Sequence, residues 1–200
     1  MSIVRQSIGI WIILILFSLP FPLDWLPRFG EFFSEIFFPL VKLVIGKSTV
    51  QTFASDSQIY YVQSAILLIP SIFLGVFFNY KFKKVSKEGI HVLISYLLAF
   101  FLLKYGIIKL FQHQFYIVEP NIAYTPAGFL SKDILFWSSM GTSQSYNLFM
   151  GSMEIITGAT LLSKRTRMLG SIMALGVFAH VFTINAGFNI TVKLLSLTLL

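Results

Sequence analysis

Long apolar runs separated by short polar segments dominate this chain. A helix needs roughly 20 consecutive apolar residues to cross a membrane, and most of the runs approach that length. We predict membrane spans at residues 3–23, 60–80, 89–111, 146–162 and 168–186. A sixth apolar run begins near Thr191 and continues to Leu200, so we expect a last span that is cut short and a sequence that is a fragment of a longer protein.

Segment 29–46 follows a different pattern. Its apolar residues recur at spacings of three and four and are Phe29, Phe32, Phe33, Ile36, Phe37, Leu40, Val41 and Val44. The opposite side carries Glu31, Ser34, Glu35 and Lys42. This pattern predicts an amphipathic helix that lies along the membrane surface or packs on the bundle. Pro39 predicts a kink in that helix.

The connection between the third and fourth predicted spans, residues 112–145, is unusually long at 34 residues. Loops of this length tend to be functional or to contain short helices of their own. Residues 131–140 are a candidate for such a helix, with Ser131 as its N-cap and Asp133 in its first turn.

The composition supports a membrane class. The chain is 56% hydrophobic and 12% charged, whereas soluble domains have about 25% charged residues. A transmembrane β-barrel would need segments of about ten residues with alternating polarity, and the runs here are continuous. We therefore predict an all-α fold, a polytopic transmembrane helical bundle of about five to six spans with an additional amphipathic interfacial helix.

The net charge of +7 is spread through short loops, where positive charge orients membrane helices rather than marking a nucleic-acid-binding protein. The basic loop residues are Arg5, the cluster Lys81, Lys83, Lys84 and Lys87, and the cluster Lys164, Arg165 and Arg167. All three groups fall on one side if five spans alternate. We therefore expect a cytoplasmic N-terminus in a bacterial cytoplasmic (inner) membrane, with the lipid bilayer as partner and no nucleic acid.

The chain contains no cysteine, which excludes disulfides, Fe–S clusters and thiolate metal sites. His91 and His113 fall at opposite ends of the third predicted span, and neither reaches the depth of His180. We therefore predict no metal centre, and no cofactor is certain from the residues alone.

Three ionisable residues on three neighbouring spans lie at a similar depth. Counted from the outer ends of the spans, Glu154 is about 12 Å deep, and Lys104 and His180 are each about 10 Å deep. An unpaired charge at such a depth costs at least about 2.5–3.5 kcal/mol. We hypothesise a Lys104–Glu154 ion pair with His180 nearby.

Small and polar residues form a stripe on each of the last two full spans. One stripe is Asn147, Gly151, Glu154 and Gly158, and the other is Gly176, His180, Thr183 and Gly187. Small residues let membrane helices approach closely, and polar residues hydrogen-bond across the contact. We expect the four glycines to pack helices together and the two stripes to face each other or a shared cleft. Thr183 and Asn185 join Lys104, Glu154 and His180 as candidate site residues.

Two interpretations of this polar cluster remain open. It could fix the register and packing of the helices, or it could bind a ligand, a quinone or a proton. At the level of function, the rivals are a quinone- or redox-associated membrane protein, a small-solute or proton-coupled transporter, and a structural or assembly subunit. We find no inverted repeat of the kind that many transporters have.

The C-terminal half carries a series of short motifs. They are Tyr105-Gly106-x-x-Lys109, Trp137-x-x-Met140-Gly141-x-Ser143-x-x-Tyr146, Gly151-x-x-Glu154-x-x-x-Gly158 with Leu161-Leu162, Arg165-Thr166-x-x-Leu169-Gly170, and Asn185 with Val192-Lys193-Leu194. Over about residues 93–200 the chain resembles the DoxX-like family of small bacterial membrane proteins.

The resemblance implies a division of the chain and a direction for its function. Residues 89–200 would be a DoxX-like four-helix membrane unit, and residues 1–88 an N-terminal extension with two spans and the amphipathic helix. The family is named for a membrane subunit linked to thiosulfate:quinone oxidoreduction, and most of its members have no assigned activity. This implies a quinone as possible cofactor and other membrane or redox subunits as partners. The chain would then be a subunit of a quinone-linked oxidoreductase rather than an enzyme on its own. Lys109, Glu154 and the Arg165-Thr166 turn would occupy motif positions that have no agreed catalytic role.

Overall fold

The computed structural model describes residues 3–18, 27–46, 56–81, 85–115 and 117–200, and every regular element in them is helical. These helices form two compact units. The first unit comprises the residues up to Ile94 together with Thr191–Leu199, and the second comprises Ser95–Ile190. The prediction of an all-α fold is confirmed.

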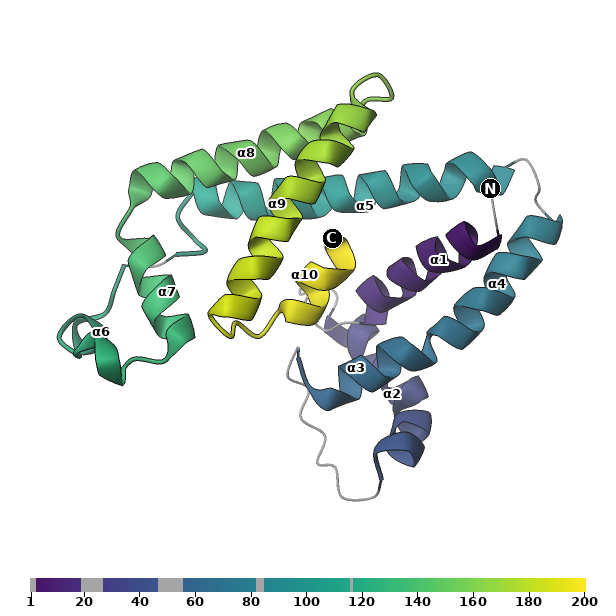
Figure 1. The fold of residues 1–200 in the computed structure, drawn as a ribbon, viewed down its shortest axis with the longest axis horizontal. Coiled ribbons are helices and arrows are strands. Elements are labelled where there is room, and N and C mark those ends of the chain that lie inside the picture. Colours follow the sequence, from purple (N-terminus) through teal and green to yellow (C-terminus); the bar gives the residue numbers. More distant parts are fainter. Residues whose placement is uncertain (1–2, 19–26, 47–55, 82–84, 116) are drawn as a thin grey trace. The chain divides into compact units, whose positions relative to one another are not determined.

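The first unit is built around two helices that lie side by side, α1 and α4 (Figure 1). Its helices are α1 (Ile3–Ser18), α2 (Pro27–Ile45), α3 (Gln58–Ile66), α4 (Leu68–Lys81) and α10 (Lys193–Leu199). Gly75 permits the close contact between α1 and α4, because a Cβ there would lie only 3.0 Å from the Cα of Ser7. Helices α2 and α10 also contact α1, so α1 is the centre of this unit.

The helix of the apolar segment Gln58–Lys81 is interrupted at Leu67, between α3 and α4. Pro70 explains the interruption. Proline has no backbone N–H to donate, and its ring clashes with the carbonyl group four residues earlier, which here belongs to Ile66. The predicted span at 60–80 therefore consists of two consecutive helices, α3 and α4.

Asp56 fixes the start of α10. Its carboxylate accepts hydrogen bonds from the backbone N–H groups of Lys193 (3.0 Å) and Leu194 (3.1 Å) and pairs with the Lys193 Nζ at 3.3 Å. A carboxylate is favourable here because the first N–H groups of a helix have no partner within the helix. The predicted sixth span begins at this point as a helix of 7 residues.

The second unit contains the C-terminal part of α5 and the helices that follow it (Figure 1). These elements are α5 (Val85–Leu110), α6 (Pro120–Ala123), the 3-10 helix η1 (Ala127–Phe129), α7 (Lys132–Gly141), α8 (Gln144–Leu162) and α9 (Arg167–Gly187). α5 and α8 touch where Gly106 meets Gly151, since a Cβ on either would lie 2.8 Å from the carbonyl oxygen of the other. After a short turn, α9 folds back onto α8, with Gly170 against the backbone of Leu161.

Two of the predicted secondary elements are confirmed. α7 has Ser131 at its N-cap and Asp133 in its first turn. The Ser131 hydroxyl donates a hydrogen bond to the Asp133 carboxylate and lowers the pKa of that group. α2 is helical across the predicted amphipathic segment and contains Pro39.

Among the described residues, three helical segments are long and apolar enough to cross a membrane, fewer than the five to six spans predicted. They are Gln58–Lys81, Gly89–Leu110 and Arg167–Gly187. α1 is a shorter apolar helix, and residues 19–23 of its predicted span lie outside the described residues. α8 is long enough at 19 residues but is less apolar, because its buried face is polar.

Candidate functional site

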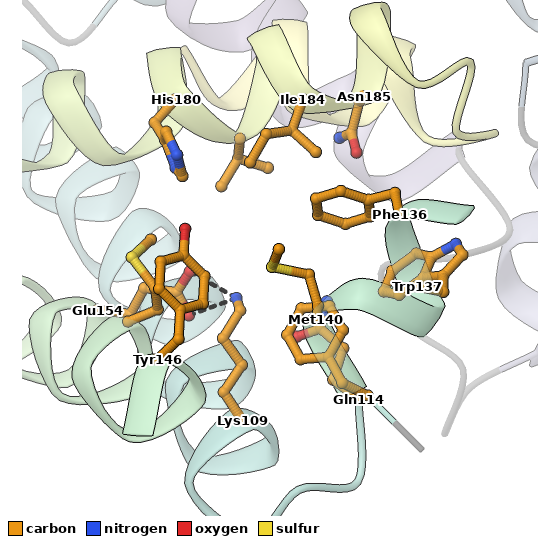
Figure 2. A pocket seen from close by; sticks show the side chains of 13 residues that line it. Lys109, Gln114, Phe136, Trp137, Met140, Tyr146, Glu154, His180, Ile184 and Asn185 are labelled. Atoms are coloured by element: carbon orange, nitrogen blue, oxygen red, sulfur yellow. Dashed lines mark hydrogen bonds and ion pairs between the residues drawn. The ribbon is translucent and has the colours of Figure 1, made fainter. Parts of the chain in front are cut away.

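A hollow in the second unit brings together side chains from four elements. α5 contributes Lys109, α7 contributes Phe136 and Trp137, α8 contributes Glu154, and α9 contributes His180 and Asn185. Figure 2 shows the Lys109–Glu154 pair and His180 on one side of the hollow, with Asn185, Phe136 and Trp137 on the other. One side is therefore charged and the other mainly aromatic.

The charged side is a buried ion pair. The Lys109 Nζ donates to both carboxylate oxygens of Glu154, at 2.6 and 2.8 Å. Only 9% of the Lys109 side chain and 3% of the Glu154 side chain are exposed. Two bonds from one ammonium satisfy both carboxylate oxygens, as burial of a charge requires.

The predicted Lys104–Glu154 ion pair is wrong, because Glu154 pairs with Lys109 instead. Gly106 is the residue of α5 that touches α8, and Lys109 lies three residues after it, on nearly the same face of the helix. Lys104 lies two residues before Gly106, about 200° around the helix, and its ammonium group is 5.7 Å from the centre of the Tyr105 ring. The prediction rested on depth in the membrane alone, whereas the face of α5 that meets α8 selects Lys109.

The predicted polar stripe on α8 is buried. Its four members, Asn147, Gly151, Glu154 and Gly158, are all buried, and a Cβ on either glycine would collide with α5. Packing roles for Gly151 and Gly158 therefore agree with the structure. The side-chain amide of Asn147 donates to the carbonyl oxygen of Met140 at 3.0 Å, which ties the start of α8 to the end of α7.

The predicted stripe on α9 is exposed instead. Gly176, His180, Thr183 and Gly187 are all exposed, and a Cβ at either glycine would meet no atom within 4 Å. The residues that α9 buries are Gly170, Ala174, Phe178 and Asn185. The packing roles predicted for Gly176 and Gly187 thus do not hold. The Gly170-x-x-x-Ala174 spacing is the sequence signal that marks the true contact face.

The remaining predicted site residues divide into two groups. His180 lines the hollow and is close enough to Glu154 to interact with it electrostatically. Asn185 also lines the hollow and is only 5% exposed. Thr183 does not line the hollow, because it lies on the exposed face and donates its hydroxyl to the Ala179 carbonyl of its own helix.

The aromatic side of the hollow comes from the long connection, and the site prediction missed it. The rings of Phe115 and Trp137 have centroids 5.3 Å apart, and Phe136 lies 4.9 Å from Phe188. These separations are typical of favourable aromatic pairs. The sequence did contain a signal for this wall. Large apolar side chains, Trp137 and Met140, lie near the end of α7, and a helix in a connecting loop seldom carries such side chains unless they pack against the rest of the fold.

The hollow is small and open to one side. The part of the hollow that the centres of water molecules can occupy has a volume of roughly 60 Å³. By the same measure, one bound water needs about 10–15 Å³. Besides the ion pair and the imidazole, the amide of Gln114 faces it, and the Gln114 Oε1 has no hydrogen-bond partner.

None of the predicted topology residues that the structure describes lines this hollow. Lys81 is exposed at the end of α4, and Lys164 and Arg165 are exposed in the turn between α8 and α9. Arg167 donates to the Leu161 carbonyl and lies 5.8 Å from the centre of the Tyr96 ring. Lys83 and Lys84 fall outside the described residues, as does the side chain of Lys87.

Comparison with known proteins gives one informative relative. No protein family model matches the chain, and no solved structure matches it. The chain is 32% identical to YwoB of Bacillus subtilis (strain 168), described as an uncharacterized protein, over 121 residues. The aligned region covers 60% of this chain and 76% of YwoB. With that identity over three quarters of the relative, the chain belongs to the same protein family as YwoB.

Proposed function

We propose that this chain is an integral membrane protein that binds a small, neutral, lipid-soluble molecule in the hollow of its second unit, with a quinone as the leading candidate. The observation that carries the proposal is the buried Lys109–Glu154 pair, which faces an aromatic wall across an open cavity. A purely structural ion pair has no need of a cavity beside it.

The charge balance favours a neutral ligand. Lys109 and Glu154 cancel each other, so the ion pair leaves no net charge on the wall of the hollow. A charged ligand would then enter a water-poor site without a counter-charge, which is costly. Anionic and cationic solutes fit poorly for this reason, whereas a neutral molecule with hydrogen-bonding oxygens fits well.

The shape of the lining favours a flat ring. Phe136 and Trp137 present aromatic surface, and Met140 adds a polarisable side chain that adapts to rings. His180 could exchange a proton with a ring oxygen, and Lys109 supplies a counter-charge to Glu154. The resemblance to the DoxX-like family supports the same redox association, with other membrane subunits supplying any catalytic centre.

The membrane arrangement is part of the proposal. We infer that α1 and α8 also cross the bilayer, which gives five or six spans with the N-terminus in the cytoplasm of a bacterial cell. α8 can do so because its polar face is covered by α5 and its acid is neutralised by Lys109. α2 would lie at the membrane surface, since Ile36, Leu40, Leu43 and Val44 form an exposed apolar stripe.

The direct test is to purify the full chain in mild detergent, extract it and look for a stoichiometric quinone. The Glu154→Gln protein should lose the bound molecule, because Lys109 then carries an unbalanced charge into the cavity. Glu35→Gln is the matched control, since Glu35 is an exposed carboxylate on α2. If the unmodified chain neither retains nor rebinds a quinone, the proposed function is wrong.

A proton-coupled transporter is the second candidate. Glu154 is a buried acid that interacts with both Lys109 and His180 beside an opening, which suits a group that gains and loses a proton during transport. Solute uptake into vesicles should then require a pH gradient and fail in Glu154→Gln. Uptake that is independent of both would exclude this alternative.

A further inference from the structure

Asn185 stands out among the residues that line the hollow. Only 5% of its surface is exposed, yet its side-chain amide makes no hydrogen bond with the described part of the chain. Asn185 lines the hollow, so its amide can find a partner there, either water or a ligand.

Asn147 provides an instructive comparison. It is also a buried asparagine, and its amide N–H donates to the Met140 carbonyl oxygen and so holds α7 against α8, although its Oδ1 has no hydrogen-bond partner in the described residues. Asn147 therefore has a structural task, and Asn185 has none in the described residues. The difference separates a packing residue from one that is available to a ligand.

The position of Asn185 defines the shape of that ligand. Asn185 follows His180 by five residues on α9, which separates them by about 7.5 Å along the helix axis. Val181 and Ile184 lie between them and line the hollow with apolar surface. Figure 2 shows Asn185 on the opposite side of the hollow from the Lys109–Glu154 pair. The cavity therefore has hydrogen-bonding groups at two ends and apolar walls between.

From this placement we propose that Asn185 is a second anchor for the ligand, which is a flat ring with an oxygen on each of two opposite sides. One oxygen binds at the Lys109, Glu154 and His180 end, and the other binds the Asn185 amide. This inference rests on the proposed function and specifies its ligand.

An amide is well suited to this task because it offers both a donor and an acceptor. Its N–H group can donate to a carbonyl oxygen, and its oxygen can accept from a hydroxyl. A neutral imidazole at the other end has the same dual capacity. The site therefore accommodates a dicarbonyl ring and the corresponding dihydroxy ring with no change in its own net charge.

The test compares two probes on the purified full chain in detergent. One is a decyl-substituted 1,4-benzoquinone, with two ring oxygens, and the other is the matching decylphenol, with one. The unmodified chain should bind the quinone about tenfold more tightly, which corresponds to one well-made hydrogen bond in a buried site. Asn185→Leu should remove that preference and leave phenol binding unchanged.

Two further variants keep the test decisive. Thr183→Val is the control, because Thr183 is on the same helix and outside the hollow. Asn185→Ser replaces Asn185→Leu if the latter does not give a folded, monodisperse protein. Unchanged quinone preference in the Asn185 variants, with binding lost in Glu154→Gln, overturns this inference and leaves the proposed function standing. Failure of the unmodified chain to bind either probe overturns both.

Discussion

Lys109 and Glu154 are each costly to bury alone, and the structure makes them a single unit. Removing one partner leaves an uncompensated charge, which typically costs about 3–5 kcal/mol. Replacing both partners by apolar residues of similar size is often neutral or stabilising. We therefore expect Lys109→Met and Glu154→Leu each to lower the thermal unfolding temperature strongly, and the double variant to recover most of the loss.

The double variant also separates stability from function. It should fold in detergent but fail to retain the ligand, because the polar end of the hollow is gone. Thermal melts followed by circular dichroism, together with extraction of bound small molecules, measure both properties. A double variant that is as unstable as the sum of the two single losses would contradict the paired arrangement.

Gln112 adopts a left-handed backbone conformation after the end of α5, with φ of 57°. Its N–H bonds to the Lys109 carbonyl and the next N–H, of His113, bonds to the Ile108 carbonyl, which together close the helix end. A left-handed conformation costs an ordinary residue about 1–2 kcal/mol, whereas glycine adopts it freely.

Gln112→Gly should therefore stabilise the chain, by roughly 0.5–1 kcal/mol once the greater entropy of unfolded glycine is included. Asn189, with φ of 57° after α9, is the matched comparison. Asparagine already tolerates this conformation better than glutamine, so Asn189→Gly should gain less. Equal gains at the two positions, or a loss at Gln112, would argue against the backbone explanation.

At the scale of helices, the α5–α8 contact depends on two glycines that touch. A Cβ on Gly106 would lie 2.8 Å from the Gly151 carbonyl oxygen and 3.1 Å from the Ile155 backbone nitrogen, and backbone atoms cannot move aside individually. Gly106→Val should push the helices apart and cost about 1–3 kcal/mol, the usual range for overpacking. Because Lys109 follows on the same face, the ion pair should loosen as well.

Gly176→Ala is the control for this experiment, since a Cβ there meets nothing within 4 Å. It should be neutral or mildly stabilising, because alanine favours the helix. Melting temperatures of the two variants, compared with the unmodified chain, decide the matter. A Gly176→Ala loss as large as that of Gly106→Val would place the glycine contact elsewhere.

The helices themselves illustrate what the sequence can and cannot specify. The stripe on α8 could be predicted because polar and small residues repeat at helical spacing within one element. The partner of Glu154 could not, because it depends on how α5 is rotated, and the residue that fixes this rotation, Gly106, acts through a contact with a distant glycine. On α9 two stripes compete, and the structure buries the less polar one, which includes Ala174 and Phe178.

At the scale of the whole chain, the all-α class followed from composition and run length, whereas the number of spans did not. Membrane crossing is a property of a helix and its neighbours together: α8 is too polar by its own residues, but α5 covers its polar face. The aromatic wall was missed for a related reason. α7 lies in a connection, and only the folded unit brings its Trp137 beside His180 and Asn185 around one hollow.

The number of spans can be tested by cysteine labelling. The chain contains no cysteine, so a single introduced cysteine is the only thiol that can react. If α1 and α8 both cross the bilayer, residues 124 and 164 lie on opposite sides of the membrane. If only the three most apolar segments cross, both residues belong to one connection and lie on the same side. Tyr124 is 88% exposed and Lys164 is exposed, so Tyr124→Cys and Lys164→Cys should both react with a thiol reagent.

Intact cells treated with a membrane-impermeant maleimide should label Tyr124→Cys and leave Lys164→Cys unlabelled until the membrane is opened with detergent. This outcome follows from five spans with basic loops in the cytoplasm. Labelling of both variants from outside, or of neither, would mean that α8 does not cross. The Lys109–Glu154 pair is buried by the chain's own helices, so the losses expected for the single substitutions should persist even if α8 does not cross.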